Sequence, residues 1–225
     1  MPQINIALDG PAGAGKSTVA RALAEKLDIL YLDTGALYRA VGVAVQQAGI
    51  PPEDEVVVAA LLPTLRITVA YQNKAQSTCL NGQTLGQELR TPEMSQLASK
   101  LSAQRAVRAH LLELQRQIAT EHACVLDGRD IGTHVLPNCP HKFFITASLD
   151  ARAQRRWLEE QQRGNGHTLE AVRADIADRD TRDANRAAAP LRQAEDAIYM
   201  DTSDMTPQDV VDAILQTIAA KRKGI

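Results

Sequence analysis

Residues 10–18 read Gly-Pro-Ala-Gly-Ala-Gly-Lys-Ser-Thr, and this stretch decides the fold. It fits the pattern Gly, any four residues, Gly-Lys-Ser without a mismatch. The run Ile4–Asp9 before it is apolar and β-branched enough for a buried strand, and Val19–Leu27 after it has apolar residues at helical spacing. Glycines between a strand and a helix let backbone N–H groups surround an anion, and the helix N-terminus adds partial positive charge. The sequence therefore predicts a phosphate-binding loop in an α/β protein.

The side chains of such a loop have defined tasks. Lys16 reaches the β- and γ-phosphates of a nucleotide, and the hydroxyl of Ser17 binds Mg²⁺, so the expected cofactors are ATP and Mg²⁺. The competing interpretation is a glycine turn with a surface lysine, which the complete match and both flanks disfavour. The residues expected to bind the nucleotide are Gly10, Pro11, Ala12, Gly13, Ala14, Gly15, Lys16, Ser17 and Thr18.

Composition excludes several classes of protein. The 225 residues include 25 basic and 27 acidic side chains, so there is no global field for nucleic acid or an anionic membrane. Cys79, Cys124 and Cys139 are odd in number and lack paired metal spacing, which favours reduced thiols over a disulfide framework or a zinc site. No apolar stretch approaches the roughly 20 residues of a membrane span, and no signal segment precedes the first strand. A cytoplasmic protein is expected.

The rest of the chain alternates between strand and helix patterns. Short apolar runs predict further core strands at residues 29–32, 123–126, 141–147 and 197–200. Helical spacing predicts helices at 36–48, at 91–121 with a break near 103, at 151–163, along 168–186 and from 207 onward. Polar residues before these helices are the expected N-caps: Thr91, Asp150, Thr168 and Thr206. Thr34 is expected either to cap the helix at 36–48 or to bind a substrate.

One segment departs from this alternation. Residues Leu65–Tyr71 alternate with period two, and Thr78–Leu85 places Asn-Gly between two short strand-like runs, as in a β-hairpin. We interpret this as a small antiparallel sheet inserted into an α/β core.

Two charged segments are candidates for the site. Asp127–Asp130 follows a predicted core strand and so lies at the same sheet edge as the phosphate loop. Arg179, Arg182 and Arg186 share one predicted helix face, with Asp183 between them. Such a stripe is generally a solvated surface. Here a phosphate loop is present, and phosphoryl transfer requires cations to neutralise charge, which favours a functional role.

Four segments, in this order and spacing, resemble the bacterial cytidylate kinase family: residues 10–18, 32–39, 127–132 and 179–190. The resemblance runs end to end. It implies one domain over 1–225: a P-loop NTPase-type parallel sheet flanked by helices (core about 1–35, 122–150 and 188–225), a monophosphate-binding region enlarged by a small antiparallel sheet (about 36–121), and a helical lid (about 151–187).

The resemblance also implies an activity, the ATP-dependent phosphorylation of CMP and dCMP to CDP and dCDP, with UMP a weaker substrate and the protein a monomer. It assigns Thr34 to the neighbourhood of the nucleotide, Ser99 and Arg108 to cytosine and the acceptor phosphate, and Arg129 with Asp130 to base and phosphate recognition. The implied substrate-binding residues are Thr34, Tyr38, Arg39, Ser99, Arg108, Arg129, Asp130, Arg179, Asp183 and Arg186. The expected catalytic residues are Lys16, Arg129, Asp130 and Arg182.

Two other classes remain as alternatives. Another P-loop kinase, of the UMP, shikimate or gluconate type, would share the loop and lid, although the last two have no reason for the inserted sheet. A non-enzymatic GTP switch needs an Asn-Lys-x-Asp motif, and the nearest string, Asn73–Gln76, lacks the aspartate.

Overall fold

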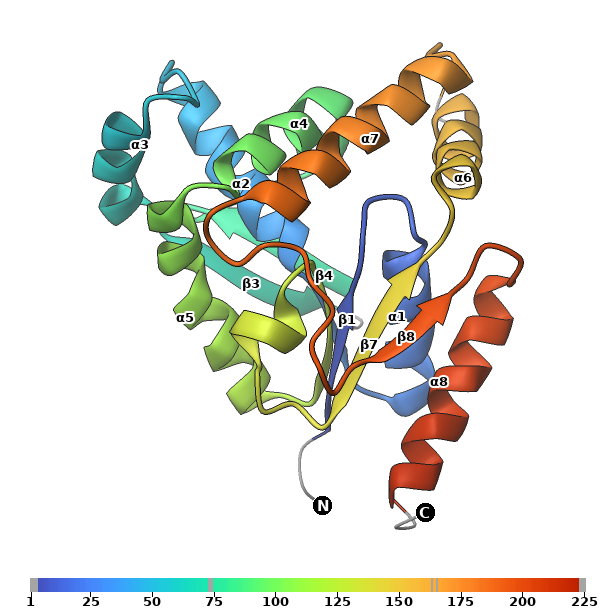
Figure 1. Ribbon diagram of the computed structural model, residues 1–225. Helices are drawn as coiled ribbons and strands as arrows, with labels where there is room; N and C mark the ends of the chain where they lie inside the picture. Colours follow the sequence, from blue (N-terminus) through green and yellow to red (C-terminus); the bar gives the residue numbers. More distant parts are fainter. Residues whose placement is uncertain (1–3, 73–74, 163, 165, 223–225) are drawn as a thin grey trace.

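The computed structural model describes residues 4–72, 75–162, 164 and 166–222, and its centre is a five-stranded sheet (Figure 1). The strands are β1 (Asn5–Asp9), β2 (Leu30–Asp33), β6 (Cys124–Asp127), β7 (His141–Thr146) and β8 (Ile198–Asp201), in the order β2-β6-β1-β7-β8. All neighbouring strands are parallel. Leu8 and Asp33 both lie opposite Asp127 in register, so β1, β2 and β6 end at one edge of the sheet. The predicted core sheet is confirmed.

Each face of the sheet packs against helices. Helices α1 (Lys16–Leu27) and α8 (Pro207–Arg222) cover one face, where Leu23 and Ile214 lie fully buried against β1 and β7. Helix α5 (Arg105–Glu121) and the π-helical turn η3 (Ile131–Val135) pack on the other face. Burial of both faces explains the continuous apolar run of the inner strand β6, whereas the edge strand β8 alternates between half-buried and exposed residues.

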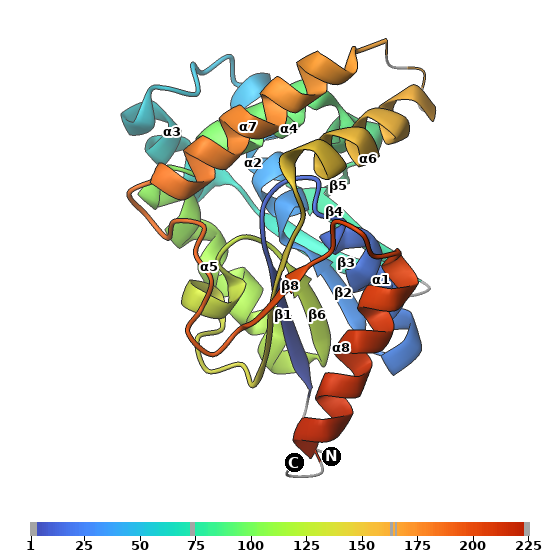
Figure 2. The same ribbon diagram turned by 45° about the vertical axis from the view of Figure 1, so that its right-hand side comes forward.

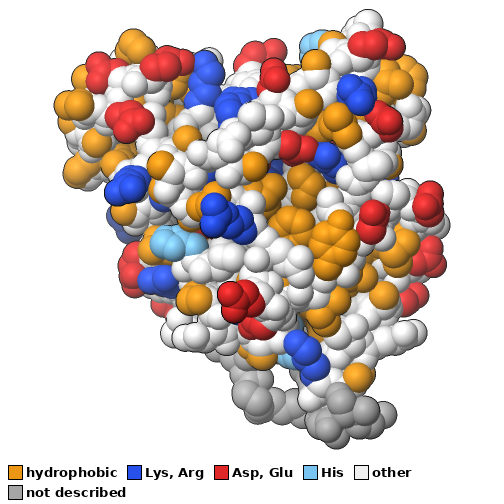
Figure 3. Space-filling model, viewed as in Figure 1, with side chains coloured by type: hydrophobic (Ala, Val, Ile, Leu, Met, Phe, Trp, Pro, Cys, Tyr) orange, Lys and Arg blue, Asp and Glu red, His pale blue; other side chains and the backbone are white. Residues whose placement is uncertain are grey.

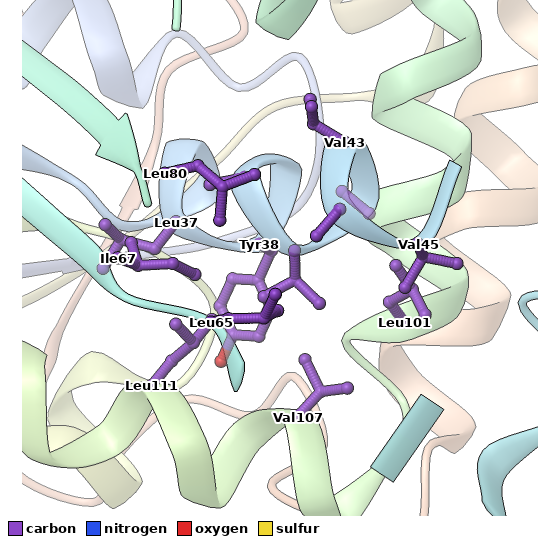
Figure 4. Packing of buried hydrophobic residues seen from close by; sticks show 14 of the residues in the cluster. Leu37, Tyr38, Val43, Val45, Leu65, Ile67, Leu80, Leu101, Val107 and Leu111 are labelled. Atoms are coloured by element: carbon purple, nitrogen blue, oxygen red, sulfur yellow. The ribbon is translucent and has the colours of Figure 1, made fainter. Parts of the chain in front are cut away.

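The segment between β2 and β6 forms the second part of the molecule. It contains α2 (Thr34–Gln47), α3 (Glu55–Leu61), the 3₁₀ turns η1 (Leu62–Thr64) and η2 (Gln87–Arg90), strands β3 (Ile67–Gln72), β4 (Ala75–Leu80) and β5 (Gln83–Thr84), and α4 (Pro92–Leu101). The strands form the predicted antiparallel sheet. Asn81 and Gly82 have φ of 50° and 84°, as the two-residue turn between β4 and β5 requires. Figure 4 shows the separate core under this sheet, where α2 packs against side chains of β3, β4 and α5.

Helices α6 (Leu149–Gln162) and α7 (Leu169–Asn185) form the predicted lid region. They pack on each other through a small cluster around Ala153, Val172 and Ile176. Figure 2 shows both helices crossing above the carboxyl ends of the core strands, and α7 also contacts α4. Between these two helices Gly164 has a φ of 78° and Gly166 is described, whereas residues 163 and 165 lie outside the described residues.

Most predicted helix ends are confirmed, and two predicted caps are wrong. Thr91, Thr168 and Thr206 accept hydrogen bonds from the expected backbone N–H groups. The cap of α2 is Asp33, which accepts from Ala36 N, and Thr34 is already helical. Ser148, rather than Asp150, accepts from Ala151 N at the start of α6. A serine beginning the turn competes better than an acid already inside the first turn, because only the residue before the helix can turn its oxygen back.

Helix α3 is absent from the sequence prediction, since its seven residues are too few to show a helical period. In the described part of the chain, no helix combines the length and apolarity that crossing a bilayer would take. Figure 3 shows acidic and basic side chains interspersed over one face of the molecule, which agrees with the net charge of −2.

Candidate active site

A large cleft lies between the core, the inserted region and the lid. Its volume is about 1610 Å³, more than the roughly 300–1,000 Å³ of a cleft for one small ligand. The phosphate loop lies on its floor, the elements α2, α4 and α5 line one side, and α6, α7 and the β8–α8 turn line the other (Figure 1). The volume is sufficient for two ligands that meet at the loop.

The loop takes the backbone conformation that its glycines predict. Gly10, Gly13 and Gly15 have φ of 146°, 74° and 83°. A Cβ on Gly10 would lie 1.9 Å from the carbonyl oxygen of Ile145, so only glycine fits between β1 and β7 there. The loop leads directly into α1, which starts at Lys16. The N-terminus of a 12-residue helix thus faces the cleft where an anion is expected.

Lys16 is buried at the base of the cleft. Its Nζ donates to the carbonyl oxygen of Pro11 at 2.7 Å. Burial, reinforced by the charge of Arg129, lowers the pKa of Lys16 to about 7, although Asp127 and Asp9 act in the opposite direction. A polyphosphate beside Nζ would stabilise the ammonium form and raise this pKa.

The predicted Mg²⁺ ligand Ser17 has an acidic neighbour. Its hydroxyl donates to the carboxylate of Asp127 at 2.5 Å, and the Tyr31 hydroxyl donates to the same oxygen at 3.3 Å. Among the described residues no group of three or more His, Cys, Asp and Glu side chains could hold a metal by itself. Mg²⁺ prefers one or two carboxylates, with phosphate oxygens and waters completing its octahedron. Ser17 and Asp127 therefore fit Mg²⁺ that arrives with a nucleotide.

Asp127 was missed as a site residue by the sequence analysis, which treated it only as part of the turn 127–130. The available signal was its place as an acid at the end of a core strand. Strand order decides its role, because β6 lies next to β1 and brings Asp127 to the helix that carries Ser17.

Acidic and basic side chains from distant segments converge beside the loop. Asp130, only 4% exposed, forms ion pairs with Arg108 and, at 3.2 Å, with Arg186. Asp183 pairs with Arg129 at 2.9 Å, and 3.9 Å separates it from Arg186. Although burial alone raises the pKa of Asp183, Arg129 and Arg186 outweigh it and hold that pKa below its usual value. The predicted charged turn and the helix stripe thus form one network.

A further arginine leaves this network with surplus positive charge. Arg179 lines the cleft. Its Nε is buried and has no hydrogen-bond partner among the described residues. Burial and the charge of Arg129 lower the pKa of Arg179 to about 10, so it is still cationic at neutral pH. Four arginines therefore face the two carboxylates of Asp130 and Asp183. Such an excess in a buried position is the expected environment of a phosphate.

The remaining predicted residues lie on the α2 and α4 side. Thr34 donates to the carbonyl oxygen of Asp127 at 2.7 Å, and Arg39 pairs with Asp33 at 2.7 Å. The guanidinium of Arg108 lies over the ring of Tyr38, 5.5 Å from its centroid. Thr34, Tyr38 and Arg39 line the cleft, together with the residues that they contact.

Ser99 is the clearest unsatisfied group on this side. It is 9% exposed, lines the cleft, and its Oγ has no hydrogen-bond partner among the described residues. Buried hydroxyls are usually hydrogen-bonded, so this oxygen points to a polar ligand.

Of the predicted substrate-binding and catalytic residues, Arg182 is the one that the structure does not bring to the cleft; from the predicted loop, Gly10 and Pro11 are also absent from the cleft lining. The Nη2 of Arg182 donates to Oε1 of Gln96 at 2.6 Å, where α7 contacts α4. Helix α7 ends at Asn185, and Arg186 continues in extended backbone toward Asp130.

Comparisons with known proteins agree on one family. The family model described as cytidylate kinase matches residues 6–220. The cytidylate kinase of Halalkalibacterium halodurans is 44% identical over 215 residues, covering 96% of this chain and 97% of that one. The cytidylate kinase of Syntrophotalea carbinolica is 42% identical over 221 residues, covering 98% and 94%. The crystal structure of an uncharacterised protein from Eubacterium ventriosum aligns with a TM-score of 0.55 at 14% identity, over 97% of this chain and 99% of that chain, and thus shares the fold.

Proposed function

Because the chain belongs to the cytidylate kinase family, we propose that it transfers the γ-phosphoryl group of ATP to the phosphate of CMP or dCMP, giving CDP or dCDP. The observation that carries the proposal is the arginine network beside the phosphate loop. A kinase acting on a neutral alcohol needs cations for one phosphorylated ligand only. Here a second cationic cluster, formed by Arg108, Arg129 and Arg186, lies beside the phosphate loop, as an acceptor that is itself a phosphate requires.

In this proposal the acceptor phosphate binds Arg108, Arg129 and Arg186. Each guanidinium already forms an ion pair with Asp130 or Asp183, so the arginines are oriented before the substrate arrives. A phosphate would add acceptor oxygens to guanidinium groups that have donors to spare. Arg39 and Arg179 stand at the edges of the same space.

The nucleoside part of the acceptor is assigned to the neighbouring polar groups. The unpaired hydroxyl of Ser99 and the carboxylate of Asp130 would hydrogen-bond the cytosine edge, and Tyr38 would border the base. Asp183 would accept a hydrogen bond from a ribose hydroxyl while it holds Arg129. These roles are the ones that the family resemblance implies, and the places of these side chains in the cleft lining support them.

The donor ATP would lie along the phosphate loop, with residues 10–18 around its phosphates and Lys16 at the β- and γ-phosphates. Ser17 and Asp127 would hold Mg²⁺, which would supply positive charge to neutralise the phosphates during transfer. Arg155 and Pro207 line the far end of the cleft, next to α6 and α8, where the adenosine part would extend.

The protein residues in this reaction bind, orient and exclude water. In-line transfer needs placement of donor and acceptor and electrostatic stabilisation of the equatorial oxygens, with little covalent work. No nucleophilic side chain is required. Helices α6 and α7 cover the loop and would keep water from taking the place of the acceptor. The proposal includes action as a monomer in the cytoplasm, a compartment where the three unpaired cysteines would stay reduced.

The decisive experiment is a coupled assay with Mg²⁺-ATP and a panel of acceptors: CMP, dCMP, UMP, shikimate and gluconate. We expect CMP and dCMP to give the largest kcat/KM, UMP less and the two acids none. Lys16→Ala should lower kcat by about 10³-fold or more, because it removes charge stabilisation from the transferring group. Phosphorylation of shikimate or gluconate in preference to CMP would refute the proposal.

A further inference from the structure

Asp9, which no assignment above uses, connects the two halves of the cleft. It ends β1, directly before Gly10 of the phosphate loop, and is 5% exposed. Its Oδ1 accepts from Ile131 N and its Oδ2 accepts from Gly132 N, both at 2.7 Å. These N–H groups follow Asp130 directly in the chain. One carboxylate thus links the donor loop to the turn that carries Arg129 and Asp130.

The turn is supported closely around this contact. A Cβ added to Gly132 would lie 3.3 Å from Oδ2 of Asp9 and 3.1 Å from Cδ of Lys142, which is tighter than ordinary packing. Lys142 is itself fixed, since its Nζ donates to the carbonyl oxygen of Pro137 and to Asp196 at 2.8 Å. The position of the turn relative to the loop is therefore set by Asp9 from one side and by Lys142 from the other.

The ionised carboxylate of Asp9 does not stabilise the folded state. Burial, aided by the charge of Asp130, raises its pKa from 3.8 to about 6, although both backbone N–H groups and Lys16 act in the opposite direction. Between pH 3.8 and about pH 6 the native state keeps a proton on Asp9 that the unfolded chain has released. The contribution of Asp9 to the free energy of unfolding therefore falls as the pH rises through this range. At neutral pH the ionised carboxylate is therefore unfavourable for folding compared with a neutral group of the same shape.

We infer that Asp9 is a positioning residue for phosphoryl transfer: by binding Ile131 N and Gly132 N it holds the acceptor turn in line with the phosphate loop. This inference rests on the proposed function. In-line transfer depends on the separation and angle of donor and acceptor, and a misplacement of about 1 Å lowers the rate by about 10²-fold. Loss of the contact should therefore reduce kcat while each nucleotide still binds its own half of the cleft.

Asp9→Asn tests this with little change of shape. The amide retains one acceptor oxygen and presents N–H to the other backbone N–H, so one of the two bonds is lost. We expect kcat to fall by about 10- to 100-fold. The KM values and the calorimetric Kd values of CMP alone and ATP alone should stay within about threefold, since the binding groups remain. Ile218→Val, a buried change on the α8 side of the core, is the control for lowered stability and should keep the wild-type kcat.

A second variant approaches the same contact from the other partner. Gly132→Ala should displace the Asp9 carboxylate by a few tenths of an ångström and lower kcat severalfold, again with little change in KM. Unchanged kcat in both variants, an equal loss in Ile218→Val, or a loss confined to the KM of one nucleotide would overturn the inference. Failure of the wild-type protein to phosphorylate CMP would instead refute the proposed function, and the wild-type assay is performed first.

Discussion

Binding of ATP at pH 8 should draw a proton from solution onto Lys16. With a pKa of about 7, Lys16 is charged in only about one molecule in ten at this pH. A bound polyphosphate offsets the burial that lowers the pKa, and once the pKa passes about 9 the lysine is charged in about nine molecules in ten. The uptake is the difference between these two fractions, about 0.8 of a proton per ATP. At pH 6 Lys16 is already charged, so its own contribution to the uptake should fall to about 0.1.

Titration calorimetry in two buffers of different ionisation enthalpy measures this directly, because the difference in heat gives the number of protons exchanged. At pH 8 the phosphates of ATP are ionised before and after binding, since phosphate monoesters titrate near pH 6. Lys16→Met cannot titrate at this position and should abolish the uptake. Lys100→Met removes an exposed lysine that pairs with Glu53 at 2.8 Å, and should leave it intact. Equal uptake in wild type and Lys16→Met would refute the argument that Lys16 is neutral before ATP binds.

Four shorter predictions address the acceptor side and Asp9. Arg129→Ala should raise the KM for CMP and leave ATP affinity nearly unchanged, and weakening of ATP alone would move this turn to the donor. If Asp183 binds the 2′-hydroxyl, Asp183→Ala should reduce kcat/KM for CMP about 10- to 100-fold more than for dCMP; equal losses would indicate the 3′-hydroxyl. Ser99→Ala should raise the KM for CMP without lowering Tm, because its Oγ has no partner to lose; a lower Tm with normal KM would contradict this. The Tm of Asp9→Asn relative to wild type should increase from pH 4 to pH 7, as the buried carboxylate ionises, and a constant difference would argue against its raised pKa.

The sequence predicts local structure well where one signal decides it. The loop 10–18 matches its pattern completely and lies between a predicted strand and a predicted helix, and Asn81-Gly82 is favoured for a tight hairpin turn. The structure confirms the local backbone of both. Contacts between distant strands are different, because they depend on strand order. The local pattern does not predict that Asp127 contacts Ser17, because the two residues are 110 positions apart in the sequence. It also does not predict that Asp9 accepts from the backbone N–H of Ile131, which is 122 positions away.

The arginine stripe shows how a correct period still gives an incomplete prediction. About 100° of rotation per residue puts Asp183 about 40° from Arg179 on one side and Arg182 about 60° away on the other. The cleft faces the side of Asp183, so Arg179 and Asp183 line it while Arg182 turns to Gln96 on α4. The prediction for Arg186 extends the helix one residue beyond its end. Arg186 has φ of −63° and ψ of 138°, and this extended backbone, rather than helical spacing, directs its guanidinium to Asp130. The charges that the sequence groups on one helix face are therefore divided by the packing of α7 into a cleft pair, a contact with α4 and an arginine beyond the helix.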